Sequence, residues 1–333
     1  MRQRETELSL FRFLAELFLW RLYTSPQQRR GRGSTCTPQD DARVMMITDT
    51  FVFVHQPKTG GHFVRDALYE ATRRENAHVL RRVARRCKLA NSRFVTESEP
   101  YHATCRDIPD QHRAKPILSV VRNPFEFYVS QYHYGWWAAY PEESFLNTDA
   151  VRASFPSFPD LSFDQFLICL NSFDKYFERL NPQRSGRADE LGVCSAQFIH
   201  FYFKEPRKIY GLLDLNGPLH TWTSKMFDVQ FLRTQSLNDD LYNFLISMGY
   251  GRRNISFIKD KPPVIPADRK TIGTRARDYM SYYSQSARDL VLNKDALLFK
   301  MFPEFLVGLK QPISTTRSLV AATIGPTQLA LSR

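Results

Sequence analysis

The stretch "FVFVHQPKTGGHFVRDALYEATRR", residues 51–74, contains the signals that decide the fold. It opens with a continuous apolar run, which is typical of a strand buried on both faces of a sheet. Two adjacent glycines, Gly60 and Gly61, then mark a tight turn, and apolar residues at helical spacing follow them. The stretch predicts a strand, a glycine turn and a helix. We expect a single strand within residues 46–56 and a helix over residues 61–76.

The turn between this strand and this helix has the residues of an anion site. Ligands of open α/β sheets bind beyond the carboxyl ends of the strands, where backbone amides and a helix N-terminus favour negative charge. Lys58 adds a full positive charge and Thr59 adds a hydroxyl donor. The turn is not a GxxxxGK[ST] phosphate loop, because its lysine precedes both glycines. The prediction is a cradle for a phosphate or a sulfate, and the alternative is a structural turn with a surface lysine.

A second stretch, "VVRNPFEFYVSQYHY" at residues 120–134, repeats the pattern of strand end and helix start. Asn123 followed by Pro124 predicts the start of a helix, with an N-cap and a proline in the first turn. Arg122 stands at the strand end, and Ser130 follows eight residues later. A guanidinium can bind a second phosphate through two hydrogen bonds, and a serine hydroxyl can add a donor. Alternatively, Arg122 pairs with a local carboxylate.

The remaining apolar segments extend the alternation of strands and helices. We expect strands within residues 207–215 and 227–237, and helices within residues 238–250 and 277–302. This alternation predicts an α/β protein with a central, mainly parallel sheet flanked by helices in three layers. We expect one domain over residues 45–311. An amphipathic and linker extension would precede it at residues 1–44, and a mobile tail would follow it at residues 312–333.

Composition restricts the class of partner. The chain of 333 residues has a formal net charge of +12, which favours anionic partners such as phosphates, sulfates, acidic glycans or nucleic acid. A surplus of charge that only maintains solubility is the alternative. No nucleic-acid recognition motif accompanies the charge, so we expect no nucleic-acid partner. The five cysteines are widely spaced and form no CxxC pair, which favours a reducing compartment over a zinc site or a disulfide framework.

Residues 8–24 form the most apolar segment of the chain. Arg12, Glu16 and Arg21 interrupt it, and such charges suit the centre of a bilayer poorly. The segment predicts an amphipathic helix that lies on the protein or on a membrane surface. We therefore expect a cytoplasmic protein, and the alternatives are membrane association or the Golgi lumen.

The pair "PKTGG" (residues 57–61) and "RNPFEFYVSQY" (residues 122–132) resembles the PAPS-dependent sulfotransferases, whose donor is 3′-phosphoadenosine-5′-phosphosulfate. The resemblance covers roughly residues 47–306 and implies a P-loop-like fold. It implies that the second motif, Arg122 and Ser130, binds the 3′-phosphate of the donor. The first motif and its neighbour would hold the 5′-phosphosulfate through Pro57, Lys58, Thr59, Gly60, Gly61 and His62.

Two positions depart from the family's pattern. The family usually has threonine or serine after the second glycine, where this chain has His62. Either the imidazole takes over the role of the hydroxyl donor, or the affinity for the donor is weakened. Many relatives have glutamate where this chain has Gln235.

The resemblance also implies the catalytic residues. "YHATCRDI", residues 101–108, resembles a segment of sulfotransferases that act on carbohydrates, which makes His102 the expected base; Glu97 and Glu99 are alternatives. Histidine suits proton transfer near neutral pH. Lys58 would stabilise the charge on the leaving oxygen, and no metal is required. The expected acceptor is a hydroxylated glycan, neutral or anionic, or a small molecule.

Two basic segments have open roles. The run over residues 73–88 either receives an anionic acceptor or forms a solvated helix face. A later stretch that contains Arg275 could cover the donor, together with Lys259, Lys261, Arg269 and Lys270. Two other functions stay open as well: a non-catalytic nucleotide- or anion-binding protein of the same fold, and a basic nucleic-acid-binding protein.

Overall fold

The computed structural model describes residues 45–86, 95–98, 103–180, 191–212, 218–264 and 275–307. The predicted N-terminal extension and C-terminal tail lie outside these ranges. Within them, no helix has the length and apolar character needed to cross a bilayer.

The centre of the molecule is a five-stranded sheet with the strand order β3-β1-β2-β4-β5. Its strands are β1 (Met45–Thr48), β2 (Val52–Val54), β3 (Val95–Ser98), β4 (Ile117–Val121) and β5 (Val229–Arg233). β2, β4 and β5 run parallel, whereas β1 is antiparallel to both of its neighbours, β2 and β3. The chain is therefore α/β, as predicted, but the sheet is mixed rather than mainly parallel.

The mixed sheet arises because the expected single strand at residues 46–56 is a hairpin. Met45 lies opposite Val54, and Ile47 lies opposite Val52. The turn is held by Thr48, whose hydroxyl donates to the carbonyl of Phe51 at 2.8 Å and accepts from the Phe51 amide at 2.8 Å. A threonine hydroxyl that bonds the nearby backbone competes with strand pairing, which explains the reversal inside an apolar run.

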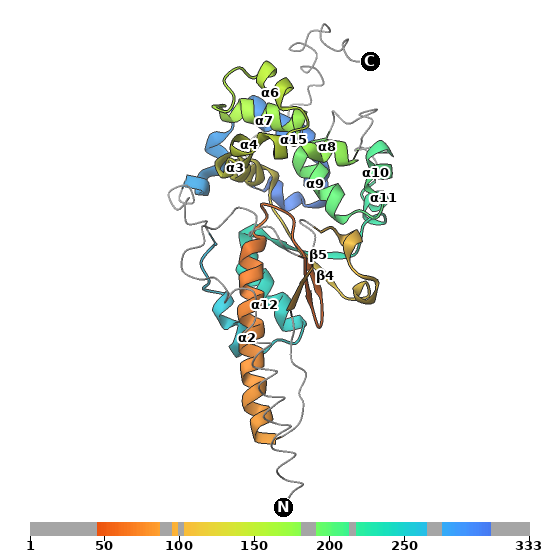
Figure 1. Cartoon of the computed structure of the whole chain (residues 1–333), viewed down its shortest axis with the longest axis vertical. Helices are drawn as coiled ribbons and strands as arrows, with labels where there is room; N and C mark the ends of the chain where they lie inside the picture. Colours follow the sequence, from red (N-terminus) through yellow and green to blue (C-terminus); the bar gives the residue numbers. More distant parts are fainter. Residues whose placement is uncertain are drawn as a thin grey trace, which may run out of the picture.

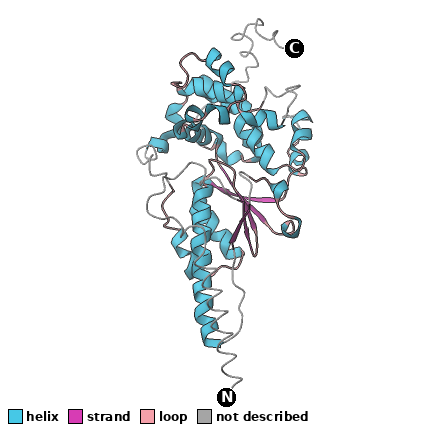
Figure 2. Cartoon of the chain, in the orientation of Figure 1, coloured by secondary structure: helices cyan, strands magenta, loops and turns pink. Residues whose placement is uncertain are grey.

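The strands alternate their side chains between two apolar cores, so both faces of the sheet are covered. Met46 and Phe53 belong to the core that includes α2 and α12, whereas Met45 and Val54 belong to the core that includes α3, α7, α9 and α16. In Figure 1, α2 and α12 lie side by side along the sheet, and the shorter helices α3 to α9 gather above it. Figure 2 shows that helix far exceeds strand in the described chain.

The helices have the following bounds: α2 (Gly61–Arg86), α3 (Pro124–Tyr134), α4 (Trp136–Ala139), α5 (Pro141–Ser144), α6 (Thr148–Ser154), α7 (Phe163–Phe173), α8 (Lys175–Leu180), α9 (Val193–Tyr202), α10 (Pro206–Leu212), α11 (His220–Thr223), α12 (Leu237–Ser247), α13 (Arg252–Ile255), α15 (Gln285–Lys294) and α16 (Ala296–Met301). The 3₁₀ turns are η3 (Cys105–Asp107), η4 (Asp110–His112), η6 (Thr234–Ser236), η7 (Ser256–Ile258), η9 (Arg275–Tyr282) and η10 (Pro303–Leu306).

The predicted helix starts are confirmed at both motifs. α2 begins at Gly61, and α3 begins at Pro124 with Asn123 as its N-cap, whose Oδ1 accepts from the Phe125 amide at 3.0 Å. α3 ends at Tyr134, because Gly135 has φ 63° and turns the chain out of the helix. The strand over residues 229–233 and the helix α12 are also as expected.

One predicted strand is wrong. Residues 206–212, in the segment expected to be a strand, form the helix α10 instead. Pro206 begins α10, and a proline at the first helical position is preorganised for a helix. The preceding Phe203 makes an isolated bridge with Met226, so the extended conformation ends before the predicted segment starts.

Candidate functional site

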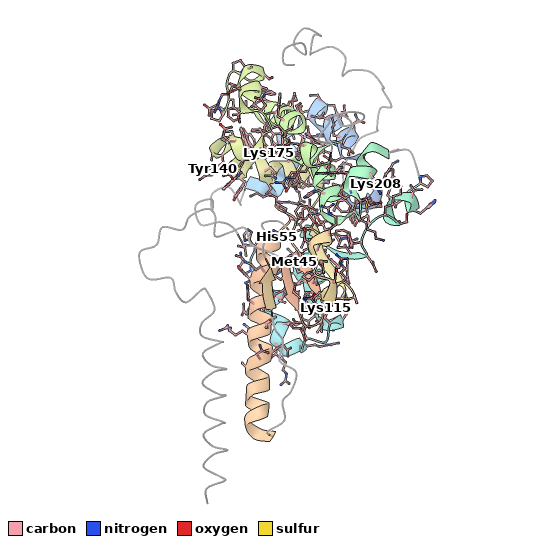
Figure 3. The ribbon with its side chains drawn as sticks, turned by 45° about the vertical axis from the view of Figure 1, so that its right-hand side comes forward. Met45, His55, Lys115, Tyr140, Lys175 and Lys208 are labelled. Carbon is pink, nitrogen blue, oxygen red and sulfur yellow. The ribbon has the colours of Figure 1, made fainter. Side chains whose placement is uncertain are left out.

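The carboxyl ends of β3, β2 and β4 lie at the same edge of the sheet. Ser98, the last residue of β3, lies opposite Met45, which lies opposite Val54, the last residue of β2. On the other side of β2, the hydroxyl of Ser119 in β4 donates to the carbonyl of Val54 at 2.6 Å. The loop over residues 55–60 therefore leaves the sheet where β3 also ends, beside the end of β4 (Figure 3, His55 and Met45).

The loop that joins β2 to α2 has an unusual backbone. Lys58 has φ 67° and Gly60 has φ 92°, so two residues of the turn are left-handed. A left-handed lysine is uncommon and costs on the order of 1 kcal/mol or more, and such residues cluster at ligand sites. Thr59 is buried, and its hydroxyl donates to the Gln56 carbonyl at 2.8 Å. Thr59 therefore holds the turn closed from inside and does not point its hydroxyl outward.

Gly61 is required because His55 packs directly against it. A Cβ at residue 61 would lie 1.9 Å from Cδ2 of His55. The His55 ring is buried, stacks on Phe53 at 6.2 Å between centroids and meets the His62 ring edge-on at 5.5 Å. His62, the departure from the family's hydroxyl residue, thus stands in the first turn of α2 as part of a histidine pair at the loop.

Arg122 connects the two sequence motifs. Its Nη1 donates to the backbone carbonyl of Lys58 at 3.0 Å, across 64 residues of sequence. Its Nε lies 3.5 Å from Oε2 of Glu126, one helical turn further along. Burial lowers the pKa of Arg122, and the charge of Glu126 opposes this shift. The arginine at the strand end therefore pairs with a local carboxylate and also braces the loop.

Lys58 lies against the same helix. Its Nζ stands over the ring of Tyr134, 2.6 Å from the ring centroid. Glu126, Ser130 and Tyr134 follow each other at intervals of four residues in α3, so they share one face of that helix. Arg122 contacts the first of the three and Lys58 contacts the last, and Ser130 lies between these two positions on the helix. The structure thus brings Lys58 and Arg122 together, and it places Ser130 on the helix face that both of them contact.

Glu126 is the site residue that sequence reasoning missed. Besides Arg122, it contacts Gln235, whose Nε2 donates to Oε1 of Glu126 at 3.1 Å. Gln235 belongs to η6, directly after β5, so a third strand end reaches the site. The signal in the sequence is the spacing of four residues between Arg122 and Glu126, which places a carboxylate one turn from the guanidinium.

Other predicted residues are placed only in part. Pro57 is half-buried in the loop beside Lys58. His102, the predicted base, lies outside the described residues, and so does Glu99; Glu97 belongs to β3, for which the structure describes the backbone only. Arg275 begins η9, which packs against α3, but its side chain is not among those described.

The two basic segments are also placed in part. Arg74, in α2, pairs with Glu70 and lies 4.2 Å over the ring of Phe257. Residues 78–86 continue α2, with their backbone alone described. Lys259 lies 4.5 Å over the ring of Tyr242, away from α3, and Arg269 and Lys270 lie outside the described residues.

The assembled groups suit an anionic ligand. The ammonium of Lys58 and the guanidinium of Arg122 contact the same face of α3, which also carries Ser130, and Glu126 offsets part of the charge of Arg122. Among the described residues, no group of three or more His, Cys, Asp or Glu side chains could hold a metal ion. No family model, curated protein or solved structure matches the chain. The geometry of the site and the resemblance of its two motifs are therefore the basis for assigning a function.

Proposed function

We propose that the chain is a PAPS-dependent sulfotransferase that transfers a sulfuryl group to a hydroxyl of a carbohydrate acceptor. The observation that carries this proposal is the hydrogen bond between Arg122 Nη1 and the Lys58 carbonyl, at 3.0 Å. It joins the loop to the segment between β4 and α3, and this supports a site that uses Lys58 together with Arg122 and Ser130. A donor with a phosphosulfate at one end and a 3′-phosphate at the other needs both groups of residues at once.

The fold that we propose with this activity is a three-layer, P-loop-like domain. The loop follows β2, a strand parallel to β4, and leads into the long helix α2, which matches the site of phosphate loops in α/β sheets. Helices on both faces of the sheet are in keeping with three layers. The antiparallel β1 and β3 extend one side of this arrangement.

The residues of the site fit the donor in two respects. A left-handed turn closed by a buried threonine is a preformed cradle, and Lys58 and Arg122 add two positive charges to it. When bound, PAPS supplies a sulfuryl group on a phosphate oxygen that leaves as the acceptor oxygen bonds to sulfur. Lys58 would neutralise the charge that develops on the leaving oxygen. Arg122 and Ser130 would hold the 3′-phosphate and fix the donor in line with the acceptor.

His102 completes the proposed mechanism. Its imidazole would accept the proton of the acceptor hydroxyl while the oxygen attacks sulfur. Ala103 and Thr104 follow it at the start of the described segment, and Thr104 is fixed by a capping box with Asp107. The proposal for His102 rests on the resemblance of residues 101–108.

A second candidate function is a nucleotide-binding protein without catalysis. The observation that favours it is that both cations already have protein partners, Lys58 on Tyr134 and Arg122 on Glu126. Such a protein would bind PAP, the product left after sulfuryl transfer, but would not turn over PAPS. Replacement of His102 by alanine would then change no activity.

Thermal unfolding in the presence of PAP tests the donor site. A ligand at one hundred times its dissociation constant stabilises the folded state by about 2.7 kcal/mol. We expect a saturable rise in the melting temperature of the wild type that is strongly reduced in Lys58→Ala and in Arg122→Ala. Lys300→Ala and Arg253→Ala are matched controls, because both residues are exposed and lie on α16 and α13.

A wild type with no response to PAP would contradict the donor assignment. If PAP binds, turnover decides between the two candidate functions. Formation of PAP from PAPS is then measured with a panel of saccharide acceptors, in the wild type and in His102→Ala. Acceptor-dependent turnover that falls at least a hundredfold in the variant supports the sulfotransferase. PAP binding without turnover supports the second candidate.

A further inference from the structure

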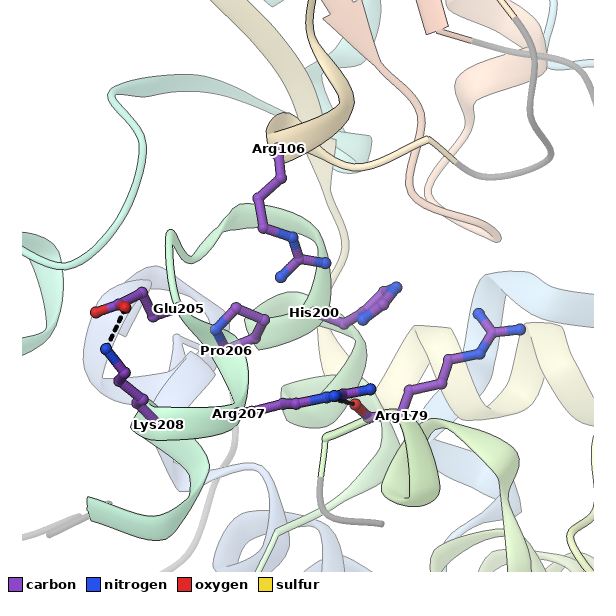
Figure 4. Close-up of a pocket in the computed structure, with 7 residues that line it drawn as sticks. All are labelled: Arg106, Arg179, His200, Glu205, Pro206, Arg207 and Lys208. Carbon is purple, nitrogen blue, oxygen red and sulfur yellow. Dashed lines mark hydrogen bonds and ion pairs between the residues drawn. The ribbon is translucent and has the colours of Figure 1, made fainter.

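A second basic region lies apart from the loop, in a pocket of about 500 Å³. Its walls come from η3, α8, α9 and α10, and its lining residues are Arg106, Arg179, His200, Glu205, Pro206, Arg207 and Lys208. Figure 4 shows Arg106 extending from one side toward His200, with Arg207 and Arg179 on the opposite side. The volume is that of a small-molecule site.

The charge of this pocket is only partly compensated. Among the described residues that line it, Glu205 is the only carboxylate, and it pairs with Lys208. Within the described part of the chain, no carboxylate oxygen lies within 4.0 Å of the guanidinium of Arg106, Arg179 or Arg207. Burial lowers the pKa of Arg106, and the negative charge of Asp107 opposes this shift and offsets part of the positive charge. The three arginines nevertheless leave an excess of positive charge at the pocket, which an anion bound there would offset.

Local contacts hold these arginines in place. Arg106 lies within η3, where the hydroxyl of Thr104 accepts from its amide at 3.3 Å as part of a capping box. Nε of Arg207 donates to the Arg179 carbonyl at 3.2 Å, and the Arg179 guanidinium lies 4.9 Å over the ring of Tyr176. The pocket is thus partly ordered before any ligand enters, which reduces the entropic cost of binding.

His200 forms one wall of the pocket and is half-buried on α9. Its burial, and then the positive charges of Arg106 and Arg179, lower its pKa to about 4. The imidazole is therefore neutral at neutral pH and offers a hydrogen bond without adding charge. An anion placed among the arginines would reverse their effect and raise this pKa.

The pocket and the loop belong to the same folded frame but share no residues. Two residues after His200, the hydroxyl of Tyr202 lies 2.7 Å from Oγ of Ser119, which in turn donates to the Val54 carbonyl at 2.6 Å. All three residues are buried. This chain of hydrogen bonds fixes α9, and the pocket on it, relative to the strand that leads into the loop. Figure 3 shows His55 and Lys208 at separate places on this frame.

We propose that this pocket binds the carboxylate or sulfate groups of an acidic saccharide, which makes an acidic glycan the acceptor of the reaction. The proposal rests on the function proposed above. A guanidinium donates two parallel hydrogen bonds to a planar carboxylate or to two oxygens of a sulfate, which a lysine cannot do. Three such groups around a space of sugar size suit a ligand with more than one negative charge. The donor binds at the loop, so the pocket is left for the other substrate.

The test measures binding by titration calorimetry, with a tetrasaccharide of alternating uronic acid and N-acetylhexosamine. Its counterpart with the carboxyl groups reduced to alcohols is the neutral probe. We expect the acidic probe to bind at least tenfold more tightly than the neutral one, with an affinity that falls as salt rises. Arg207→Ala should weaken the acidic probe about tenfold, and Arg207→Lys, which keeps the charge but not the fork, several-fold.

Arg253→Ala is the matched control, because it removes the same charge from an exposed position on α13. Equal binding of the acidic and neutral probes, or equal affinity in Arg207→Ala and Arg253→Ala, would overturn the proposal. A PAP-induced thermal shift that shrinks in Arg207→Ala would also overturn it, because the pocket would then be a nucleotide site. Unfolding without ligand checks that each variant is folded.

The outcomes separate this proposal from the proposed function. Binding of PAP at the loop without Arg207-dependent binding of the acidic saccharide would overturn the pocket proposal alone. Arg207-dependent binding of the saccharide in a protein that ignores PAP would overturn the role of the pocket as an acceptor site. Arg207-dependent binding together with sulfuryl transfer to the same saccharide supports both.

Discussion

The loop at residues 55–61 and the pocket around His200 are both cationic, but their positively charged side chains differ in the partners that they contact. In the loop, Lys58 lies on the ring of Tyr134 and Arg122 lies beside Glu126. In the pocket, the guanidinium groups of Arg106, Arg179 and Arg207 have no carboxylate within 4.0 Å in the described part of the chain.

The two regions therefore depend on different properties. The loop depends on shape: a left-handed lysine, a glycine pressed against a histidine and a brace from Arg122 define where an anion can sit. The pocket depends on excess charge held in an open space. We therefore expect the loop to be sensitive to small changes in volume. The pocket should instead be sensitive to the loss of a single charge and to salt.

The largest effect should come from Gly61→Ala, which tests the dependence of the loop on shape. The new methyl group would meet the His55 ring at 1.9 Å, and His55 is buried and cannot move aside without repacking. We expect a loss of about 2–4 kcal/mol in the free energy of unfolding and loss of the PAP-induced thermal shift. Denaturant unfolding measures the first quantity.

The control for this variant is Gly135→Ala. Gly135 has φ 63°, but no atom lies within 4 Å of the position that its Cβ would take. Its replacement should cost about 1 kcal/mol, from backbone strain alone, and leave PAP binding in place. Equal costs for the two variants would show that the contact with His55 does not define the loop.

The next effect concerns α9, which carries His200 of the pocket and is linked to β2 through the hydroxyls of Tyr202 and Ser119. Both oxygens of the buried Asp295 carboxylate accept hydrogen bonds. Oδ1 accepts from the amide of Ser195, in the first turn of α9, at 2.7 Å, and Oδ2 accepts from the hydroxyl of Tyr128, in α3, at 2.7 Å. Burial raises the pKa of Asp295 from 3.8 to about 6, and these hydrogen bonds reduce the shift. Asp295 is therefore protonated in the folded protein at a pH where it is ionised in the unfolded chain.

The raised pKa of Asp295 determines whether the free energy of unfolding rises or falls with pH. Between pH 3.8 and about 6 the unfolded state binds fewer protons than the folded state, so stability falls as pH rises. The fall amounts to about 3 kcal/mol, at about 1.36 kcal/mol per pH unit. Asp295→Asn should lack this component. The measurement is the free energy of unfolding of the wild type minus that of Asp295→Asn, determined at pH 4 and at pH 7. The titration of Asp174 and of His200 contributes equally to both proteins and therefore cancels in this difference. A difference that is constant across this range would contradict the assignment.

The sequence predicted the parts of the fold that local residues determine. Nearby side chains determine three of these features: the helix start at Asn123 and Pro124, the glycine turn, and the strand at residues 229–233. The hairpin at residues 45–54 was not predicted. Its apolar pattern is that of a single strand, but the Thr48 hydroxyl holds a turn that reverses the chain. α10 did not follow either, since Pro206 and packing against α8 and α9 outweigh the apolar pattern of its residues.

The candidate site was predictable only as separate pieces. Lys58 and Arg122 are 64 residues apart in the sequence. They approach each other because β2 and β4, the strands that precede them, pair in parallel. Glu126 could have been found from its spacing to Arg122, but its contact with Gln235 requires β5 to lie beside β4. The basic pocket joins residues from 106 to 208, and no local pattern marks it.

A smaller effect is expected from Glu126→Gln, which leaves Arg122 without a paired carboxylate, as the arginines of the pocket are in the described part of the chain. Glutamine keeps a hydrogen-bond acceptor for Arg122 and removes a negative charge beside the proposed 3′-phosphate. We expect PAP to bind roughly fivefold more tightly, from the loss of a like-charge repulsion across partly solvated protein. The thermal shift as a function of PAP concentration gives the affinity.

Glu304→Gln provides the matched control for this charge change. Glu304 also pairs with an arginine, Arg233, at 3.0 Å, but it is on η10 and exposed. It should leave PAP affinity unchanged. Weaker PAP binding in Glu126→Gln would show that the carboxylate positions Arg122 and that its role in orientation outweighs the repulsion.

The smallest effect should come from Tyr134→Ala, which releases Lys58 from its contact with the ring. A cation–π contact at a partly exposed site is worth about 0.5–1 kcal/mol, which Lys58 must give up before it can reach an anion. The variant should bind PAP about two- to fivefold more tightly, whereas Tyr134→Phe should behave like the wild type because it keeps the ring. Tyr242→Ala removes a comparable ring beneath Lys259 on α12 and should have no effect on PAP. If Tyr134→Ala instead binds PAP less tightly, the ring holds the Lys58 ammonium in the position that the donor requires. In that case both the backbone of the loop and its positive charge are in place before the donor binds.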